Sequence, residues 1–312
     1  MKKAQHIELA RQAPLPVRDG VAPSRVYLPR GPWTLLRDFL FQRFPHMPRA
    51  TLLERLARGD IVDEAGVAQT LDSPYKAQGW LWYYREVPDE THVPFDLPVL
   101  FRDEYLVVVD KPHFLASIPG GRYLRETALI RLRQSLGLPL LSPMHRLDRD
   151  TAGVLLFCAA PQSRGAYQML FQSREVRKEY EAIAPLCRGV EFPLIRRSRL
   201  EARPGHFTMQ EVDGEANSET QIDLIETMGD LARYRLYPST GRKHQLRVHM
   251  SALGIPICND GFYPALQPYA PDDDFSRPLQ LLARAVEFVD PVSGRLRRFQ
   301  SGRSLARAAP GE

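Results

Sequence analysis

One short stretch of the sequence, residues 144–153, concentrates side chains capable of acid–base or nucleophilic chemistry directly before an apolar run. It contains Asp148 between Arg146 and Arg149, with a second carboxylate at Asp150. Functional residues are common in such loops, because a loop at the end of a buried strand contributes little to core packing. An ionised carboxylate can attack a carbon atom or remove a proton, and neighbouring arginines can bind a polyanion. An ordinary charged surface loop is the alternative interpretation.

A second polar stretch, residues 240–250, begins with a turn and continues into a predicted helix. Positive charge and helix N–H groups at such a start favour phosphate binding. The candidates for phosphate contact are Arg242, Lys243 and His244. Arg247 could instead pair with a carboxylate on a facing loop and keep it ionised. His244 and His249 lie five residues apart, so they do not share a helix face as a metal-binding pair would, and partly buried structural histidines are the alternative.

A third candidate is Tyr180, in a stretch Arg-Lys-Glu-Tyr that opens a predicted strand, where an ordinary strand aromatic is the alternative. The sequence lacks GxxxxGK[ST], GxGxxG and GxSxG motifs. ATP chemistry, a nicotinamide cofactor and a serine triad are therefore not indicated. We expect no cofactor and no metal.

The overall composition is that of a globular protein with a basic bias. The 312 residues are 44% hydrophobic, which allows a core and excludes disorder of the whole chain. Lys and Arg number 42 against 37 Asp and Glu, and the resulting charge of +5 with a pI near 9.1 is a mild excess that fits an RNA partner. No apolar run approaches the ~18 residues of a membrane helix. The start lacks the apolar stretch of a secretory signal, and three cysteines without a CxxC pair exclude a disulfide framework. We expect a cytoplasmic protein without membrane attachment.

The elements that position these residues fall into several parts. Residues 1–30 are rich in proline and are predicted to be an extended leader. Residues 31–87 form a small module with helices near 33–41 and 50–57 and strands near 61–62 and 80–84. Prolines indicate a linker over residues 87–97, before a domain of residues 98–300 and a tail of residues 301–312. The module carries arginines on or near its helices: Arg37, Arg43, Arg49, Arg55 and Arg58.

The large domain mixes strands with a few helices and shows no regular βαβ rhythm. Apolar or alternating runs predict strands near residues 106–109, 154–157, 180–184, 221–225 and 232–236. Helical spacing predicts helices at 126–136, 164–172 and 244–253. These elements predict an α+β fold with a mixed, largely antiparallel sheet, preceded by a small α/β module. A basic run at residues 295–298 is predicted to be a solvated edge strand, with an RNA contact as the alternative.

In their order, these stretches resemble the RluA family of pseudouridine synthases over about residues 107–288. Residues 145–154 resemble the central motif, whose aspartate is the catalytic residue and corresponds to Asp148. Residues 178–180 resemble the second motif, whose tyrosine lies against the target uracil and corresponds to Tyr180. Residues 241–249 resemble the third motif, whose arginine pairs with the catalytic aspartate and corresponds to Arg247. Residues 110–112 and 281–288 resemble the flanking motifs.

The resemblance implies isomerisation of uridine in RNA: the N-glycosidic bond breaks, the uracil turns, and a carbon–carbon bond to ribose forms. It implies no cofactor, and it implies that the uridine first leaves its stack. Asp148 would attack the ribose or the uracil, or remove a proton to form a glycal, and the sequence does not choose among these routes. The residues expected to contact RNA are Arg146, Arg149, Arg242, Lys243, His244 and Lys111.

Two positions depart from the family pattern, Phe114 where glycine is usual and Leu282 where histidine is usual. Both lie in segments expected to frame the cleft, so they are candidates for substrate choice rather than for chemistry. The module of residues 31–87 is weakly similar to the RNA-binding module of ribosomal protein S-four type, and a helical cap without RNA contact is its alternative. This module favours large-subunit ribosomal RNA as the substrate, with transfer RNA as the alternative, and a monomer is expected.

Two functions of other classes remain open from the sequence alone. One is a non-catalytic RNA-binding or ribosome-assembly factor built on the same fold. The other is a glycosidase-like enzyme in which Asp148 works with a second carboxylate such as Asp150, because a two-carboxylate mechanism needs side chains roughly 5–9 Å apart. The basic surroundings of Asp148 fit a polyanion better than a neutral sugar.

Overall fold

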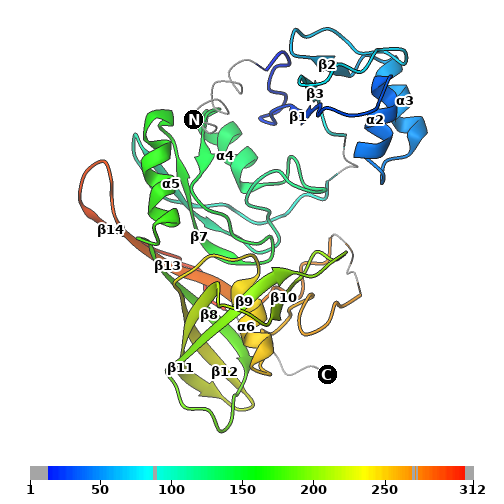
Figure 1. Cartoon of the computed structure of the whole chain (residues 1–312). Helices are drawn as coiled ribbons and strands as arrows, with labels where there is room; N and C mark the ends of the chain where they lie inside the picture. The colour runs from blue at the N-terminus through cyan, green and yellow to red at the C-terminus, as the bar shows by residue number, and fades with distance from the viewer. Residues whose placement is uncertain (1–12, 87–89, 269–270, 272, 306–312) are drawn as a thin grey trace. The chain divides into compact units, whose positions relative to one another are not determined.

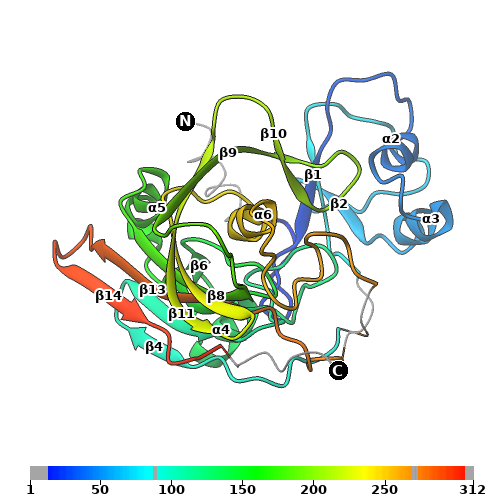
Figure 2. The same cartoon turned by 90° about the horizontal axis from the view of Figure 1, so that it is seen from below.

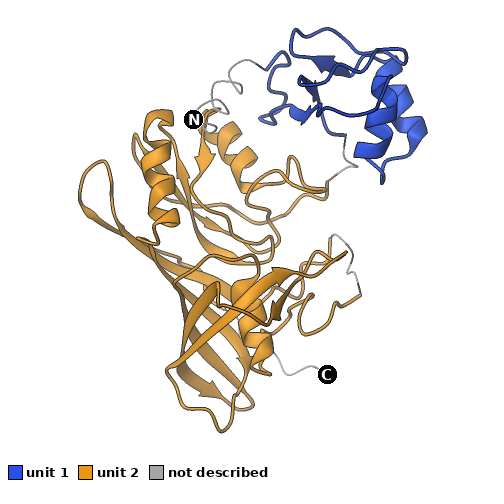
Figure 3. Ribbon diagram, in the orientation of Figure 1, with its two compact units in different colours: residues 1–88 blue, residues 89–312 orange. Residues whose placement is uncertain are grey.

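The computed structural model describes residues 13–86, 90–268, 271 and 273–305. The chain divides into two compact units, residues 1–88 and residues 89–312, shown in blue and orange in Figure 3. The predicted α+β class is confirmed, since the larger unit is built on one extensive, mostly antiparallel sheet with few helices. In the described part of the chain, no helix is long and apolar enough to cross a membrane.

The first unit is a three-stranded antiparallel sheet with two helices. The sheet order is β1 (Ser24–Tyr27), β3 (Trp80–Tyr83) and β2 (Ile61–Asp63), and the helices are α2 (Leu36–Arg43) and α3 (Arg49–Ala57). Strand β1 corrects the predicted leader, because residues 24–27 pair with β3 and bury Val26 in the module core. A proline on each side of β1 ends the pairing there, which explains why the segment looked extended in sequence. Residues 1–12 lie outside the described residues.

The second unit carries an eleven-stranded sheet (Figure 1). Its main path runs in the order β10, β9, β11, β12, β8, β13, β7, β5 and β4, with β14 paired to β13 and β6 paired to β7. Only the β13–β7 pair is parallel among these ladders. The strands are β4 (Val99–Arg102), β5 (Leu106–Lys111), β6 (Ser142–Pro143), β7 (Ala152–Cys158), β8 (Arg177–Pro185), β9 (Leu194–Ala202), β10 (Met209–Val212), β11 (Ser218–Met228), β12 (Leu231–Pro238), β13 (Leu281–Val289) and β14 (Leu296–Gln300). The helices are α4 (Ala128–Leu136), the short 3₁₀ turn η1 (Pro161–Ser163), α5 (Arg164–Gln172) and α6 (Gln245–Ala252).

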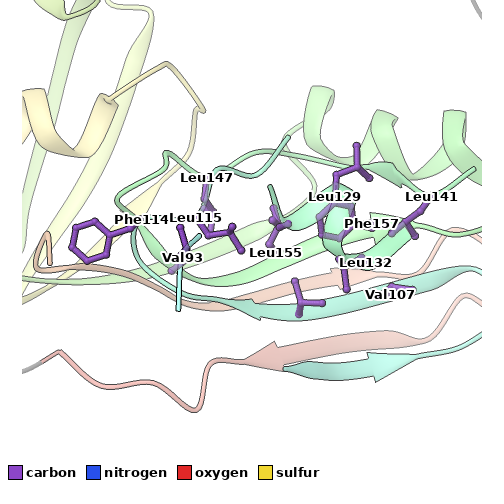
Figure 4. Packing of buried hydrophobic residues seen from close by; sticks show 13 residues of the cluster. Val93, Val107, Phe114, Leu115, Leu129, Leu132, Leu141, Leu147, Leu155 and Phe157 are labelled. Carbon is purple, nitrogen blue, oxygen red and sulfur yellow. The ribbon is translucent and has the colours of Figure 1, made fainter. Parts of the chain in front are cut away.

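Strands β5 and β7 are apolar on both faces because a helix covers each face. Val107 and Phe157 pack with Leu129 and Leu132 of α4, as Figure 4 shows for this cluster. The alternate residues of the same strands pack on the other side with Tyr167 and its neighbours on α5. A strand buried on both faces needs a continuous apolar run, and this is the pattern the two sequences have.

Helix α6 covers the other half of the sheet. Leu246 and Met250 pack against apolar residues of β8, β11 and β12. On its opposite side Val248 packs with Leu200 of β9, so that α6 is enclosed by the β9–β10 hairpin and the sheet (Figure 2). The residues before and at the start of α6 are therefore held from both sides.

Two further segment boundaries differ from the predictions. Residues 90–97, predicted to be linker, pack on the second unit: the Glu90 carboxylate accepts backbone N–H groups of residues 124–126, and Val93 is buried in the core. Residues 301–305, predicted to be tail, are also held, since Ser301 donates to Asp110 at 2.7 Å and Leu305 is buried. Residues 87–89 and 306–312 lie outside the described residues. The strand predicted at residues 295–298 is present as β14.

Candidate active site

A cavity of about 2230 Å³ in the second unit brings the three predicted stretches together. Its lining includes the loop of residues 143–151, the segment of residues 238–247 and Tyr180 of β8. Asp148, Tyr180 and Arg247, which are far apart in sequence, all line it. Residues 256–268, between α6 and β13, form another part of the wall.

A glycine sets the end of the Asp148 loop. Gly153 lies where β7 runs parallel to β13, with φ +112° and with Ala283 opposite it. A Cβ atom at this position would lie 2.2 Å from the carbonyl oxygen of Ala283, so that a side chain would push the two strands apart. Only glycine combines this φ with this close approach. The loop therefore enters the sheet at a fixed point five residues after Asp148.

The other anchors of the loop are buried polar contacts. Ser117 donates to the carbonyl oxygen of Leu147 at 2.7 Å and accepts its N–H at 3.0 Å. Lys111 is fully buried, and its ammonium donates to the carbonyl oxygens of Pro112, Leu115 and Arg149. Burial lowers the pKa of Lys111 to about 7 against the opposing charges of nearby carboxylates. The prediction that Lys111 contacts RNA is therefore wrong in this structure, because its ammonium is buried and its hydrogen bonds hold the loop.

Asp148 lies beside a buried ion pair. Arg247 donates from Nε to Asp260 Oδ2 at 2.8 Å and from Nη2 to Asp260 Oδ1 at 2.5 Å. Its third nitrogen, Nη1, reaches Asp148 Oδ2 at 3.5 Å. The predicted pair of Arg247 with Asp148 is thus present, but Asp260 is the closer partner and was not foreseen. The Asp260 carboxylate also accepts the backbone N–H groups of Phe262 and Tyr263, which fixes it in place.

The two carboxylates that share Arg247, Asp148 and Asp260, are unequally compensated by its charge. The Asp148 side chain remains 31% exposed toward the cavity, whereas those of Arg247 and Asp260 are 1% and 0% exposed. Burial raises the pKa of Asp148 above its ordinary value, and Arg247 opposes that rise. Burial alone would lower the pKa of Arg247, but the hydrogen bonds and charge of Asp260 outweigh it and raise that pKa. Arg247 thus stays cationic, and Asp148 is a carboxylate that is only partly compensated.

His244, predicted to contact RNA, is buried beside Asp148 instead. Its backbone has the left-handed φ of +54° directly before α6, and its Nε2 lies 4.0 Å from Asp148 Oδ2. Its Nδ1 lies 2.9 Å from the hydroxyl of Tyr263, which itself accepts the Met209 N–H. Burial, aided by the charges of Arg247 and Lys243, lowers the pKa of His244 to about 3. The imidazole is therefore neutral, with Nδ1 hydrogen-bonded to the Tyr263 hydroxyl and Nε2 facing Asp148.

Tyr180 and Lys178 reach the cavity from β8. Burial raises the pKa of Tyr180, and the Asp148 charge adds to the effect, so the phenol is protonated at neutral pH. Lys178 donates to the carbonyl oxygen of Thr240 at 2.7 Å, and burial lowers its pKa to about 8. Lys178 thus ties the strand that carries Tyr180 to the segment that precedes α6.

The predicted RNA-contacting arginines lie at different depths. Arg146 is exposed on the cavity wall and has neither a hydrogen bond nor an ion pair within the described residues. Arg149 pairs with Asp150 at 3.0 Å and lies over the rings of Phe114 and Tyr123. The ion pair with Arg149 argues against the alternative in which Asp150 is a second catalytic carboxylate.

Lys243 and Arg242 are exposed at the cavity next to the start of α6. Arg242 donates from Nε to the carbonyl oxygen of Asn217, and Lys243 donates to the carbonyl oxygen of Phe207. The backbone N–H of Arg242 is already bonded to Gln245 Oε1 at 3.1 Å, so this N–H is not open to phosphate. The side-chain cations remain available on this side of the cavity.

His145, in the predicted central motif, is a packing residue. Its ring stacks on Phe171 with centroids 4.7 Å apart, and its Nε2 accepts the Leu156 N–H. Burial lowers the pKa of His145 to about 3. Of the two positions that depart from the family pattern, Phe114 lines the cavity, whereas Leu282 is buried against Ile183 away from it. The segment around position 282 does line the cavity, through Leu281, but the Leu282 side chain itself points into the core.

Known proteins of the same kind match this chain. A family of RNA pseudouridylate synthases matches residues 105–252. The chain is 32% identical over 225 residues to the dual-specificity RNA pseudouridine synthase RluA of Haemophilus ducreyi, covering 68% of this chain and 96% of that protein. It is 33% identical over 214 residues to the protein of the same name from Escherichia coli strain K12, covering 66% of this chain and 92% of the relative.

The fold is shared as well. The human RNA pseudouridylate synthase domain containing 4 superposes with a TM-score of 0.52 at 26% identity, over 67% of this chain and 88% of that one. Sheet, cavity and matched sequence together define an RNA pseudouridine synthase, an isomerase that converts uridine in RNA to pseudouridine. Within that class, the chain belongs to the RluA family.

Three site residues were not found from the sequence: Asp260, Phe262 and Phe207. Asp260 and Phe262 stand in the stretch Asn-Asp-Gly-Phe-Tyr, which reads as a turn and gives no sign of a partner. The one available signal is that Arg247 stands among the apolar residues Leu246, Val248 and Met250 of a predicted helix, where a cation needs a carboxylate partner. Sequence spacing does not say which of 37 acidic residues supplies it.

Proposed function

We propose that Asp148 is the catalytic residue of the isomerisation, that Arg247 sets its charge, and that Tyr180 lies against the target uracil. The observation that carries this proposal is the unequal pairing at the cavity, where Arg247 is saturated by Asp260 and reaches Asp148 only at 3.5 Å. A carboxylate whose pKa is raised is, in its ionised form, a stronger nucleophile and base than an ordinary aspartate.

Tyr180 has a complementary role in this proposal. Its phenol is protonated, since its pKa is raised, so it can stack on the base and donate a hydrogen bond to it. Arg146, exposed at the cavity wall beside Asp148, is suited to a backbone phosphate or to the gap that a flipped uridine leaves. Arg242, Lys243 and Arg149 add positive charge along the same cavity.

We further propose that the substrate is a uridine of large-subunit ribosomal RNA, with transfer RNA as the second candidate. The support is the first unit, in which Arg43 and Arg49 are exposed on α2 and α3 and lie over Phe44 and Phe41. Exposed arginines on aromatic rings suit RNA binding. Two relatives are named as dual-specificity enzymes, so the second substrate class is tested alongside the first. The monomeric state and cytoplasmic location stay predictions.

The deciding experiment maps pseudouridine in total RNA from cells that lack the gene, cells in which it is restored, and cells restored with Asp148→Asn. We expect one or more sites to vanish on deletion and to return only with the intact aspartate. The RNA that carries them identifies the substrate. A site that returns with Asp148→Asn would overturn the catalytic assignment, and an unchanged map would favour the non-catalytic RNA-binding factor.

Asp148→Asn also needs to be shown to fold. The pKa of Asp148 is raised in the folded protein, so the stability this group contributes is present below its unfolded pKa and is lost as pH rises through the folded pKa. The neutral isostere should therefore be at least as stable as the wild type at pH 7. Equal RNA binding by the two proteins completes the control.

A further inference from the structure

Phe207 is an exposed aromatic side chain at the cavity that contains Asp148. It lies in residues 203–208, between β9 and β10, and 65% of its surface is exposed. Single exposed apolar residues are common on protein surfaces and need no explanation by themselves. Phe207 differs because it lines the cavity and because its position is fixed by several neighbours.

The contacts of Phe207 hold the ring in place. Its centroid lies 5.4 Å from that of His244 and 5.7 Å from that of Phe262, which it meets edge-on. The ammonium of Lys243 lies 3.2 Å from the ring centroid and donates to the Phe207 carbonyl oxygen. His244 and Phe262 are in turn stacked beside Arg247 and Asp148. The exposed ring is therefore attached to the walls of the site itself.

The surroundings of Phe207 carry a surplus of exposed positive charge. Arg146, Arg242 and Lys243 are exposed and line the same cavity. An open aromatic ring among exposed cations matches the two parts of a nucleotide, a base that stacks and a phosphate that needs a counter-charge. A uridine that leaves its stack also leaves neighbours without a partner, and these neighbours need support while the enzyme acts.

We propose that Phe207 is a stacking platform for the base of a nucleotide next to the flipped uridine. The proposal rests on the RNA-modifying function of the cavity and adds a subsite to it. Lys243, which touches both the ring and the loop backbone, holds the platform in place and faces the phosphate of that nucleotide. Phe207 thus acts on RNA binding and on the choice of sequence around the uridine, and it takes no part in the bond changes.

The test compares Phe207→Ala, Phe207→Tyr and Leu296→Ala. Leu296 is 67% exposed on β14 and does not line the cavity, so it controls for the loss of an exposed apolar side chain. The RNA is a stem-loop around the mapped uridine, with a second set in which each flanking nucleotide in turn lacks its base. A mixed-sequence single-stranded RNA is measured in parallel. Dissociation constants and single-turnover rates at saturating enzyme are recorded, with thermal melts to confirm folding.

We expect Phe207→Ala to bind the intact stem-loop roughly tenfold or more weakly, with little change in the saturated rate, and Phe207→Tyr and Leu296→Ala to bind as the wild type does. Removing one flanking base should weaken the wild type by a similar factor and should not weaken Phe207→Ala further. Unchanged affinity of Phe207→Ala, or equal losses in both proteins on removal of every flanking base, would overturn the proposal. An inactive wild type would instead contradict the proposed function. The affinities of the wild type and Phe207→Ala for the single-stranded RNA would then still test the stacking role of Phe207.

Discussion

The two faces of strand β8 differ in their residues and in their roles. On one face, Glu179 and Glu181 belong to an ion-pair ladder across β12, β13 and β14. On the other face, Tyr180 enters the cavity where Asp148 meets Arg247. The members of the ladder are Glu179, Glu181, Arg233, Arg235, Arg284 and Arg298.

The difference lies in how the charges are matched. Glu181 has Arg284 at 2.8 Å and Arg233 at 3.5 Å, and these arginines outweigh burial and lower its pKa. Asp148 shares a single arginine with Asp260, and burial raises its pKa. The density of charged residues is therefore a poor guide to a functional site. A carboxylate short of counter-charge at a cavity is the better one.

The largest expected effect comes from breaking the buried pair. Asp260→Asn leaves Arg247 buried with only Asp148 as a charged partner, so we expect a loss of about 3–5 kcal/mol in the free energy of unfolding. Arg247 is then free to close on Asp148, which should lower the single-turnover rate by about a hundredfold. Urea unfolding and rate measurement of the purified variant check both.

The matched variant for this prediction is Arg298→Ala on the ladder. Arg298 is 45% exposed, and an exposed ion pair contributes at most about 1 kcal/mol. We expect its rate to equal that of the wild type. Equal destabilisation by Asp260→Asn and Arg298→Ala would remove the contrast between the buried pair at the cavity and the ion-pair ladder.

Acid affects the cavity and the ion-pair ladder in different pH ranges. His145 and His244 have pKa values of about 3 in the folded protein, far below the ordinary 6.5. The unfolded chain binds their protons first, so stability is lost as pH falls from about 6.5, by roughly 1.4 kcal/mol per pH unit for each histidine. The lowered pKa of Glu181 costs stability only as pH falls below about 4.5.

Urea unfolding of the wild type and of His145→Gln at pH 7.5 and pH 5.5 tests this assignment. Glutamine keeps an acceptor for the Leu156 N–H and cannot be protonated, so the variant should lose less stability between the two pH values. An identical loss in both proteins would show that His145 does not titrate in this window.

The smallest effect is expected at His244. His244→Gln removes the ring that packs between Phe207 and Tyr263 and the nitrogen that faces Asp148, so we expect a rate about tenfold lower. The shape of the rate profile between pH 6 and pH 8 should not change, because the histidine is neutral throughout. Single-turnover kinetics across this range provide the measurement.

His249→Gln is the control for that variant. His249 is also buried on α6, but it bonds to Ser198, Ser218 and Thr220 on the sheet and does not line the cavity. Its rate should match the wild type. A pH-dependent difference between His244→Gln and the wild type in this range would mean that His244 exchanges a proton during the reaction.

Much of the fold was predictable where the pattern of burial is local. The predicted helix at residues 164–172 is α5 to the residue, and the apolar runs at 106–109 and 154–157 lie within β5 and β7. Strands β9 and β10 were missed, because β9 reads Leu-Ile-Arg-Arg-Ser-Arg-Leu-Glu-Ala and buries only Leu200 among its nine residues. Such a strand is held by backbone pairing with β11, and a periodicity of side chains does not report that pairing.

The site was predictable to the same degree. Spacing and residue type marked three stretches, the resemblance to the RluA family singled out Asp148, Tyr180 and Arg247 within them, and the structure brings all three to one cavity. Lys111 and His244 had the right type for RNA contact but are buried, since their donors and rings serve the loop and the carboxylate. Whether a cation faces solvent is decided by the chain folded over it, and sequence spacing does not carry that information.

The sequence by itself determined the class of fold, the enzyme family and the loop that carries Asp148, because these depend on local patterns and ordered motifs. Only the tertiary structure decided that Asp260 holds Arg247, that Lys111 anchors the loop and that Phe207 stands at the cavity. Each of these facts joins residues far apart in the chain: Asp260 meets Arg247 from the segment after α6, and Lys111 reaches Arg149 across a gap of 38 residues. Burial and proximity of that kind exist only in the folded chain, and they set the charge on Asp148.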